Sequence, residues 1–340
     1  MKHFLLVNFI LWLAAALKPV YGQSLKDSST MLLRISEDND FINFYMKGTD
    51  NAYTNGTRID FFYLKNARPH FFVDRILPKA GANSINVYGW GLTQLMYTPN
   101  DIATTDYQPN DYPYAGALYT THSLYSYNVE KKYDFQTEIE LGVRGPAAFT
   151  KQTQTFVHRL INYQSPMGWA HQARNAAIVN VNFSVEKLLA SYGGWLELIS
   201  GVQGSAGSLY NALDIYQELR VGKMSAYFNG LISQYSTTRS TRHSIQAYLF
   251  AKSQPVLVFS DPLLQAKVRT NDAKIIINPD AADKPVQLYH DINRLVYYFT
   301  YGGVISSGHF SISLSQSSNT ALLKDLYSHE YGNISLYFSW

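Results

Sequence analysis

One histidine and one pair of oxygen-bearing side chains are the residues of this sequence best suited to chemistry. His158 lies in a long segment between two predicted strands, and Asn39-Asp40 comes directly after another predicted strand. A histidine can accept a proton from water near neutral pH, and carboxylate and amide oxygens are the ligands that a hard cation prefers. If the fold brings the two segments together, they could form a general base beside a cation site.

Each of these residues has a simpler explanation when it is taken alone. His158 could be a solvated loop histidine, and Asn39-Asp40 could be a turn in which both side chains bond to nearby backbone. Thr54 precedes Asn55-Gly56, which is a typical hairpin-turn sequence. Other catalytic classes find no support, because the sequence has no Gly-x-Ser-x-Gly, His-Glu-x-x-His, phosphate-loop or cysteine-based metal motif. The placement of these segments in the fold must decide between the interpretations.

The two ends of the chain indicate export and insertion into an outer membrane. A cationic start, an apolar run and a small-residue exit predict a signal peptide over residues 1–22 and a mature domain over residues 23–340. At the other end, apolar and polar residues alternate from Asn333 to the terminal Trp340. We expect this terminal aromatic strand to be recognised by the outer-membrane assembly machinery.

Between the ends, apolar and polar residues alternate in segments long enough to cross a membrane as strands. Aromatic residues make up 15% of the chain, with 27 tyrosines, yet the mean hydropathy is only −0.17. A membrane barrel explains both values. Its strands have an apolar outer and a polar inner face, which lowers the mean hydropathy, and its girdles at both interfaces are rich in tyrosine. The sequence therefore predicts an all-β, antiparallel transmembrane β-barrel of about twelve strands. These are expected near residues 30–38, 54–64, 84–97, 114–127, 132–145, 177–190, 194–204, 214–223, 241–252, 292–303, 308–317 and 331–340.

Two segments, 225–233 and 256–270, could be strand or loop and leave the count open. An even number of strands places both termini in the periplasm and the connections after odd-numbered strands outside. Three outer loops, at 39–53, 98–112 and 146–176, then hold the least routine local sequences of the chain, among them Asn39-Asp40 and His158. The 65–83 connection falls on the periplasmic side and is long for a periplasmic turn.

Charge and cysteine content narrow the class further. A net charge of +3 with no basic run gives no reason to expect a nucleic-acid partner. The absence of cysteine from 340 residues is common in bacterial envelope proteins. Glu138, Glu140 and Arg144 are expected to form a charge network in the lumen rather than to act as catalytic groups. A soluble exported β-protein would show the same alternation, but the two chain ends favour a barrel in the outer membrane of a Gram-negative bacterium.

At its outer loops the chain resembles the lipid A 3′-O-deacylase family of outer-membrane enzymes, the LpxR-like barrels. The match covers about the first half of the mature chain, and the second half resembles the family only as barrel strands. The matching pieces are Asn39-Asp40, Tyr53-Thr54-Asn55-Gly56, Asp111-Tyr112-Pro113-Tyr114-Ala115-Gly116, Gly145-Pro146, His158-Arg159, Gly168-Trp169 and the aromatic terminus.

The resemblance implies an outer-leaflet active site that removes the 3′ acyl chain of lipid A with the help of calcium. The lipid A part of lipopolysaccharide would be the partner, and we expect the protein to act as a monomer. The family's general base falls on His158, its Asn-Asp pair on Asn39 and Asp40, and its hydroxyl residue on Thr54. Asp40 and Asn39 would hold Ca²⁺, which could stabilise the oxyanion formed during ester hydrolysis.

The sequence departs from the family pattern at two positions. The family relies on a lysine shortly before the segment that matches Asp111, and Pro109 or Asn110 stands there in this chain. Relatives carry arginine where this chain has Tyr112. Loss of these cations leaves a second interpretation open, in which the chain is a non-catalytic outer-membrane barrel, either a structural protein or a narrow pore.

Overall fold

The protein is described by a computed structural model in which residues 30–44, 51–64, 71–225, 227, 245–265 and 291–340 are placed. The predicted signal peptide, residues 1–22, and most of the ambiguous segment 225–233 lie outside these residues. No helix among the described residues is long and apolar enough to cross a membrane.

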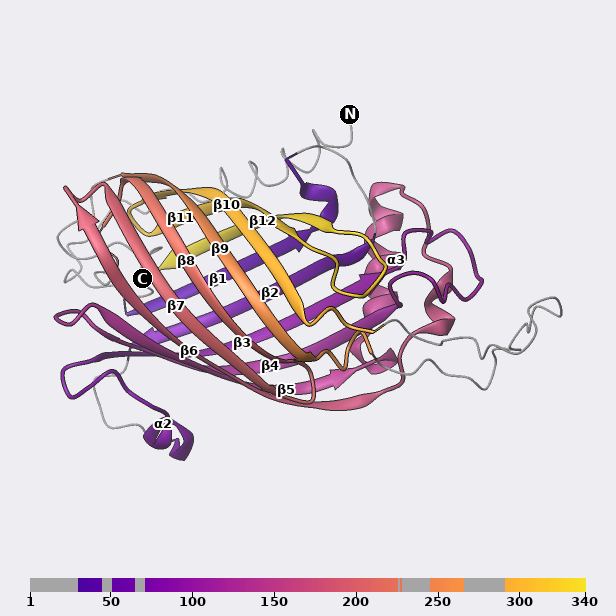
Figure 1. The fold of residues 1–340 in the computed structure, drawn as a ribbon, viewed down its shortest axis with the longest axis horizontal. Helices are drawn as coiled ribbons and strands as arrows, with labels where there is room; N and C mark the ends of the chain where they lie inside the picture. Colours follow the sequence, from indigo (N-terminus) through magenta and orange to yellow (C-terminus); the bar gives the residue numbers. More distant parts are fainter. Residues whose placement is uncertain (1–29, 45–50, 65–70, 226, 228–244, 266–290) are drawn as a thin grey trace.

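Twelve antiparallel strands close into one barrel, in which each strand pairs with its sequence neighbours and β1 pairs with β12 (Figure 1). The strands are β1 (Met31–Asn39), β2 (Ala52–Leu64), β3 (Ile85–Thr98), β4 (Ala115–Asn128), β5 (Tyr133–Arg144), β6 (Ala176–Tyr192), β7 (Leu196–Gly207), β8 (Asn211–Lys223), β9 (Gln246–Ser260), β10 (Leu295–Ser307), β11 (Phe310–Asn319) and β12 (His329–Ser339). All twelve predicted strands are confirmed. β9 continues to Ser260, so residues 256–260 of the ambiguous segment are strand.

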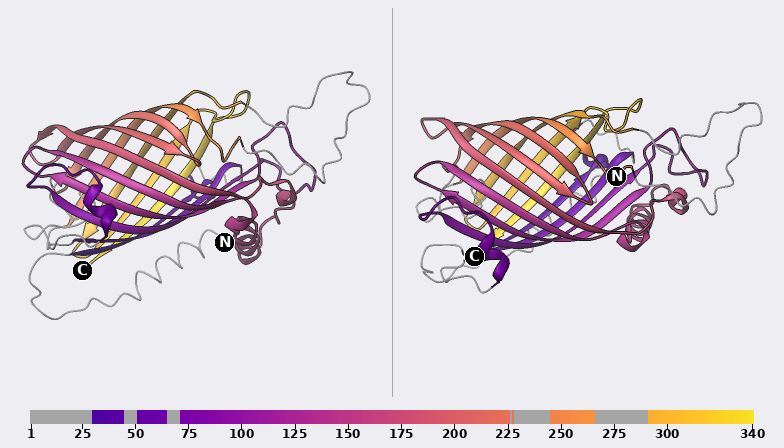
Figure 2. Two further views of the ribbon diagram at one scale, coloured as in Figure 1. Left: turned by 90° about the horizontal axis from the view of Figure 1, so that it is seen from below. Right: turned by 60° about the horizontal axis from the view of Figure 1, so that its bottom comes forward.

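Short helices occupy three of the connections. The 3₁₀ helix η1 (Asp40–Ile42) follows β1, and α2 (Phe72–Ile76) lies in the long periplasmic connection. The third outer loop holds η2 (Pro146–Ala148), the twelve-residue helix α3 (Thr150–Ile161) and η3 (Gly168–His171). α3 stands at the outer end of the barrel and α2 at the opposite end, both outside the wall (Figures 1 and 2).

The two faces of the wall differ in polarity, as alternation requires. Exposed apolar side chains such as Leu92, Leu141, Val179, Ile215 and Ile305 cover the outer face. The terminal Trp340 is also exposed and stacks near Phe61, at a ring distance of 5.9 Å. This apolar outer face is the surface that a bilayer covers, and it excludes the soluble alternative.

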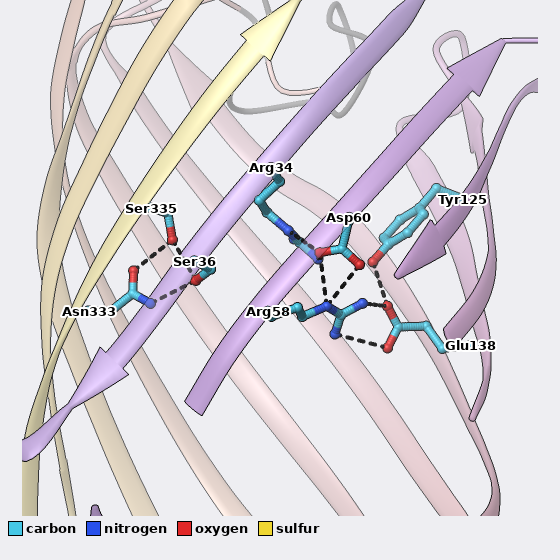
Figure 3. Close-up of polar contacts among 8 residues, drawn as sticks. All are labelled: Arg34, Ser36, Arg58, Asp60, Tyr125, Glu138, Asn333 and Ser335. Carbon is cyan, nitrogen blue, oxygen red and sulfur yellow. Dashed lines mark hydrogen bonds and ion pairs between the residues drawn. The ribbon is translucent and has the colours of Figure 1, made fainter. Parts of the chain in front are cut away.

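The lumen is filled by layers of side chains. At the periplasmic end, an apolar cluster closes it and is made of Leu32, Phe62, Val87, Tyr127, Ile199, Tyr227 and Tyr337. Next comes a charged layer, in which Arg58 bridges Asp60 at 2.9 Å and Glu138 at 2.7 Å (Figure 3). Above this layer is a cavity of about 370 Å³, which the outer loops cap. Among the described residues, side chains therefore fill the lumen at the levels of the apolar cluster and the charged layer.

The charge network predicted for Glu138, Glu140 and Arg144 is only partly as expected. Glu138 does belong to it, since it also accepts a hydrogen bond from Tyr125 at 2.9 Å (Figure 3). Glu140 accepts a hydrogen bond from the amide of Asn182 at 2.9 Å. Arg144 instead donates to the backbone carbonyl of Pro262 in an outer loop. It ends β5 at the outer rim, where a loop carbonyl lies within reach.

Arg58→Met is expected to destabilise the barrel by about 3 kcal/mol, because it leaves the Glu138 carboxylate without its cation at 2.7 Å, while Asp60 keeps Arg34 at 2.7 Å. Lys324→Met is the matched control, because its ion pair with Asp291 at 3.2 Å is exposed and such pairs contribute less than about 1 kcal/mol. Urea unfolding of both variants in lipid vesicles measures the difference. Equal stability losses in the two variants would contradict a structural role for the charged layer.

Candidate active site

The segment after β1 is held in a fixed conformation by its own side chains. Asn39 caps η1, since its Oδ1 accepts a hydrogen bond from the backbone N–H of Phe41 at 2.8 Å. Asp40 is fully buried, and its Oδ2 accepts from the backbone N–H of Asn51 at 2.8 Å. The amide of Asn43 donates to the Asp40 carbonyl at 2.7 Å. The predicted Asn-Asp pair is thus part of a turn that these hydrogen bonds hold in place.

This turn lies on the lipid-facing side of the wall. A Cβ on Gly332 would fall 1.8 Å from the carbonyl oxygen of Ile42, so only glycine lets the segment rest on β12. The backbone N–H of Phe44 donates to the side chain of Gln316 in β11 at 2.9 Å. Gly332 and Gln316 are paired across the sheet and share the outward face with the exposed Leu314. η1 is therefore outside the barrel.

Thr54 stands at the start of β2, where a bulge shifts the register between Tyr53 and Asn55. Its side chain is buried, and its hydroxyl shares a hydrogen bond with the hydroxyl of Thr98 at 2.7 Å. The bulge re-aims the chain, so that Asn55 pairs with Asn39 across the hairpin. The predicted hydroxyl residue thus sits beside the predicted Asn-Asp pair, at the same outer rim.

The helix α3 turns its polar face to the wall and its apolar face outward. Its buried residues are Thr150, Gln154 and His158, which recur every four positions and share one face. A Cβ on Gly116 of β4 would fall 2.2 Å from the Thr150 hydroxyl, so the helix rests directly on the strand. The exposed apolar residues of the helix and its cap are Phe149, Phe156, Val157, Leu160 and Ile161. This inverted polarity suits a helix with lipid on its outer side.

His158 is fixed by contacts on two sides. Its Nδ1 bonds to the backbone carbonyl of Gln164, and because a carbonyl only accepts, Nδ1 must carry the proton. In the neutral ring the lone pair then lies on Nε2. The ring packs edge-on against Tyr163 at 5.1 Å, and Tyr163 packs against Phe41 at 6.0 Å. Two ring contacts therefore connect His158 to the turn that holds Asp40.

The strand register shows the same proximity. Asn39 pairs with Asn55, Asn55 with Met96, and Met96 with Gly116, so these residues form one row across four strands. η1 follows one end of the row, and α3 packs on the other end. We call Asn39, Asp40, Thr54 and His158 the rim site, because the fold brings all four to this part of the outer rim.

Two aromatic residues of this region were missed by the sequence reasoning. Phe41 and Tyr163 link the two loops, and neither belongs to a recognisable motif. The polar face of α3 did leave a signal, since Thr150, Gln154 and His158 recur at helical spacing. Gln154 accepts a hydrogen bond from the buried indole N–H of Trp169 at 2.7 Å, which explains why the Gly168-Trp169 motif accompanies the histidine.

Tyr112 bonds to backbone groups of another outer loop. It is fully buried, and its hydroxyl donates to the carbonyl of Tyr327 at 3.2 Å and accepts from the N–H of Leu322 at 3.1 Å. Burial and the nearby carboxylate of Asp111 raise the pKa of Tyr327, so that phenol stays protonated and donates to Asp111 at 2.9 Å. Tyr112 thus joins two outer loops over the lumen.

The rim site contains donors that suit a hard cation but no rich cluster of them. No group of three or more histidine, cysteine or acidic side chains that could hold a metal occurs among the described residues. The Asp40 carboxylate accepts one backbone hydrogen bond, and a carboxylate has lone pairs for more than one bond. Together with amide oxygens such as that of Asn39, it fits an oxygen-ligated ion that takes its other ligands from water or substrate.

The lumen cavity of about 370 Å³ is a separate place, and its lining includes none of the rim residues. It is lined by Tyr97, Glu140, Asn182, Asp261 and Tyr298 among others. Burial raises the pKa of Asp261 to about 6. Because this cavity lies inside the wall under the loops, a lipid in the bilayer cannot reach it sideways. We therefore take the rim site as the candidate active site.

Comparison with known proteins identifies the family and the fold of the chain. The model of the family described as "Outer membrane protein LpxR" matches residues 7–340. Among solved structures, LpxR from Salmonella typhimurium has a TM-score of 0.71 and 18% identity, covering 91% of this chain and 100% of that one. At this identity the similarity shows the fold. The beta domain of the Bordetella autotransporter BrkA has 9% identity, a TM-score of 0.43, and coverage of 92% of this chain and 100% of its own, a likeness too weak to carry an argument.

A search of the curated proteins finds no match. The family match nevertheless spans nearly the whole chain, including the second half that shows no motif of its own. It agrees with the closed twelve-stranded barrel and with the apolar outer face of the wall. The chain therefore belongs to the LpxR family, an outer-membrane lipid A deacylase family, and resides in the outer membrane of a Gram-negative bacterium.

Proposed function

We propose that this protein is a calcium-dependent lipid A 3′-O-deacylase in which His158 is the general base. The observation that carries the proposal is the orientation of α3, whose polar face, with His158, is buried against the outside of the wall while its apolar face is exposed. This orientation supports a role for His158 as a base at the level of the outer leaflet, where lipid A resides. A lipid substrate can then enter from the bilayer without passing through the lumen.

The hydrogen bond from Nδ1 to Gln164 orients the imidazole for this role. Nε2 takes a proton from a water molecule as its oxygen attacks the ester carbonyl. The tetrahedral intermediate then collapses, the bond between the acyl carbon and the 3′ oxygen of the sugar breaks, and the imidazolium returns the proton to the leaving alkoxide. The products are a fatty acid and a free 3′ hydroxyl on the lipid.

The remaining rim residues surround the developing negative charge. A calcium ion held by Asp40 and Asn39 would supply positive charge close to the oxyanion. Thr54 and Asn55 offer a hydroxyl and an amide to the polar part of the substrate from β2. The cations that the resemblance leads us to expect near Asp111 are replaced here by Pro109 or Asn110 and by the buried Tyr112, so we expect phosphate groups of lipid A to be held less tightly than in those relatives.

The alternative is a barrel on the same scaffold without catalysis. Its pore version has less support, because side chains of the apolar cluster and the charged layer occupy the lumen at two levels of the described structure. Its structural version predicts that the parent protein releases no acyl chain from any lipid A. An assay of the parent protein therefore comes before any assay of a variant.

His158→Ala is expected to lower the deacylation rate about 10²–10⁴-fold, the usual contribution of a general base. His171→Ala is the matched control, because this partly exposed histidine of the same loop bonds the Thr105 carbonyl at 2.9 Å and packs on Tyr107, and it is not part of the rim site. Mass spectrometry of lipid A from cells that express each variant measures the loss. Full activity in a correctly assembled His158→Ala barrel rules out this mechanism.

Asp40→Asn is expected to raise the calcium concentration needed for half-maximal activity by about tenfold or more, because it removes the formal charge that attracts the ion. Asp106→Asn, in an exposed part of the second outer loop, should leave the requirement unchanged. The deacylation rate is measured as calcium is added, and calcium binding is measured by calorimetry. Together they separate an effect on calcium affinity from an effect on the rate. An unchanged requirement in Asp40→Asn would place the ion elsewhere.

A further inference from the structure

The periplasmic connection between β2 and β3 folds back onto the lipid-facing side of the wall. α2 lies outside the barrel, at the end where the chain's C-terminus is drawn (Figures 1 and 2). Beneath it, the outward-facing residues Tyr88 and Leu124 are only 2% and 0% exposed, whereas the next outward residue on β3, Trp90, is 48% exposed. The connection therefore covers a patch of wall that would otherwise face the bilayer.

A buried polar pair fastens the connection to the wall. The Asp74 carboxylate of α2 lies 2.7 Å from Nε2 of His122 on β4, and the two side chains are only 5% and 6% exposed. The rings of Trp90 and Phe71 cover His122 at 4.3 Å and 5.2 Å. Placing a carboxylate on the lipid-facing side of a wall is costly unless it is paired and covered. Both conditions are met, so this pair acts as a latch.

Backbone bonds hold the far end of the same segment. The N–H of Ala80 donates to the Ser126 hydroxyl at 2.9 Å, and its carbonyl accepts from the Asn128 amide at 2.9 Å. The tyrosine Tyr133 of β5 also donates to this carbonyl at 2.9 Å. The segment from Phe71 to Ala80 is therefore docked at both ends.

The docked segment turns its large apolar side chains away from the protein. Phe72 and Ile76 are four residues apart, so they share the helix face opposite Asp74, and they are 66% and 73% exposed. Arg75 is exposed beside them, and Lys79 follows one turn later, partly exposed. A short helix with this pattern is amphipathic, with its polar latch toward the wall and its apolar face toward the surroundings.

We propose that residues 71–79 form an interfacial anchor that binds phospholipids of the periplasmic leaflet. Phe72 and Ile76 insert between acyl chains, and Arg75 and Lys79 lie at the level of the phosphate groups. The exposed face continues the lipid-facing wall at Trp90, an aromatic residue of the kind found at membrane interfaces. The anchor is independent of the rim site, which lies at the opposite end of the barrel, and it fixes how deeply the barrel sits in the bilayer.

A single label can test the position of the anchor, because the chain contains no cysteine. Ile76→Cys in the mature protein is labelled with an environment-sensitive fluorophore and reconstituted into nanodiscs of phosphatidylethanolamine and phosphatidylglycerol. We expect blue-shifted emission that is largely quenched when the acyl chains are brominated. The matched control is Glu130→Cys in the exposed β4–β5 turn, whose label should remain in water and unquenched.

Two outcomes would overturn the proposal. Water-like emission at position 76 would place the helix in the aqueous periplasm. Blue-shifted emission that brominated lipid does not quench would show that protein, such as a second copy of the chain, covers this face. The latch is tested by Asp74→Ala and by His122→Ala, which remove the pair from either side. Both should lose most of the quenching at position 76 while the barrel stays heat-modifiable, and unchanged quenching in both would refute the latch.

Discussion

In a closed barrel, every second residue faces the lumen and the others face lipid, and this constraint decides what each polar residue can do. Arg58 and Glu138 face inward and pair with each other across the lumen at 2.7 Å, so their charge is used to fill the barrel. His122 and Gln316 face outward, where an uncovered polar group is costly. Each of these two residues is covered by a connection that folds back over the wall.

The same arrangement recurs at both ends of the barrel. At the outer end η1 covers Gln316 and Gly332, and α3 covers Gly116 with its polar face. At the periplasmic end the connection with α2 covers His122. Polar groups that lie under these connections, on the outside of the wall, are within reach of a substrate that stays in the membrane. The rim site is the covered region that contains a histidine, a carboxylate and a hydroxyl. We therefore assign the chemistry to it.

Much of this fold could be predicted from the sequence, because alternation and the two chain ends are local signals. The twelve strands were found this way, and the outer loops that hold Asn39, Asp40 and His158 followed from counting them. The packing of these connections on the outside of the wall could not be predicted. The contacts of Ile42 with Gly332 and of Thr150 with Gly116 depend on strands that are distant in sequence. The inward position of Tyr112, which joins two loops over the lumen, was hidden for the same reason.

The central claim is that lipid A meets the protein on the outside of its wall, between η1 and α3. A photo-crosslinking phenylalanine analogue at Tyr163, which stands between Phe41 and His158, tests it most directly. The same analogue at Tyr298, which lines the lumen cavity, serves as the comparison. Irradiation of intact cells should join lipopolysaccharide to position 163 and leave position 298 free of it. Crosslinking at 298 with none at 163 would contradict the account.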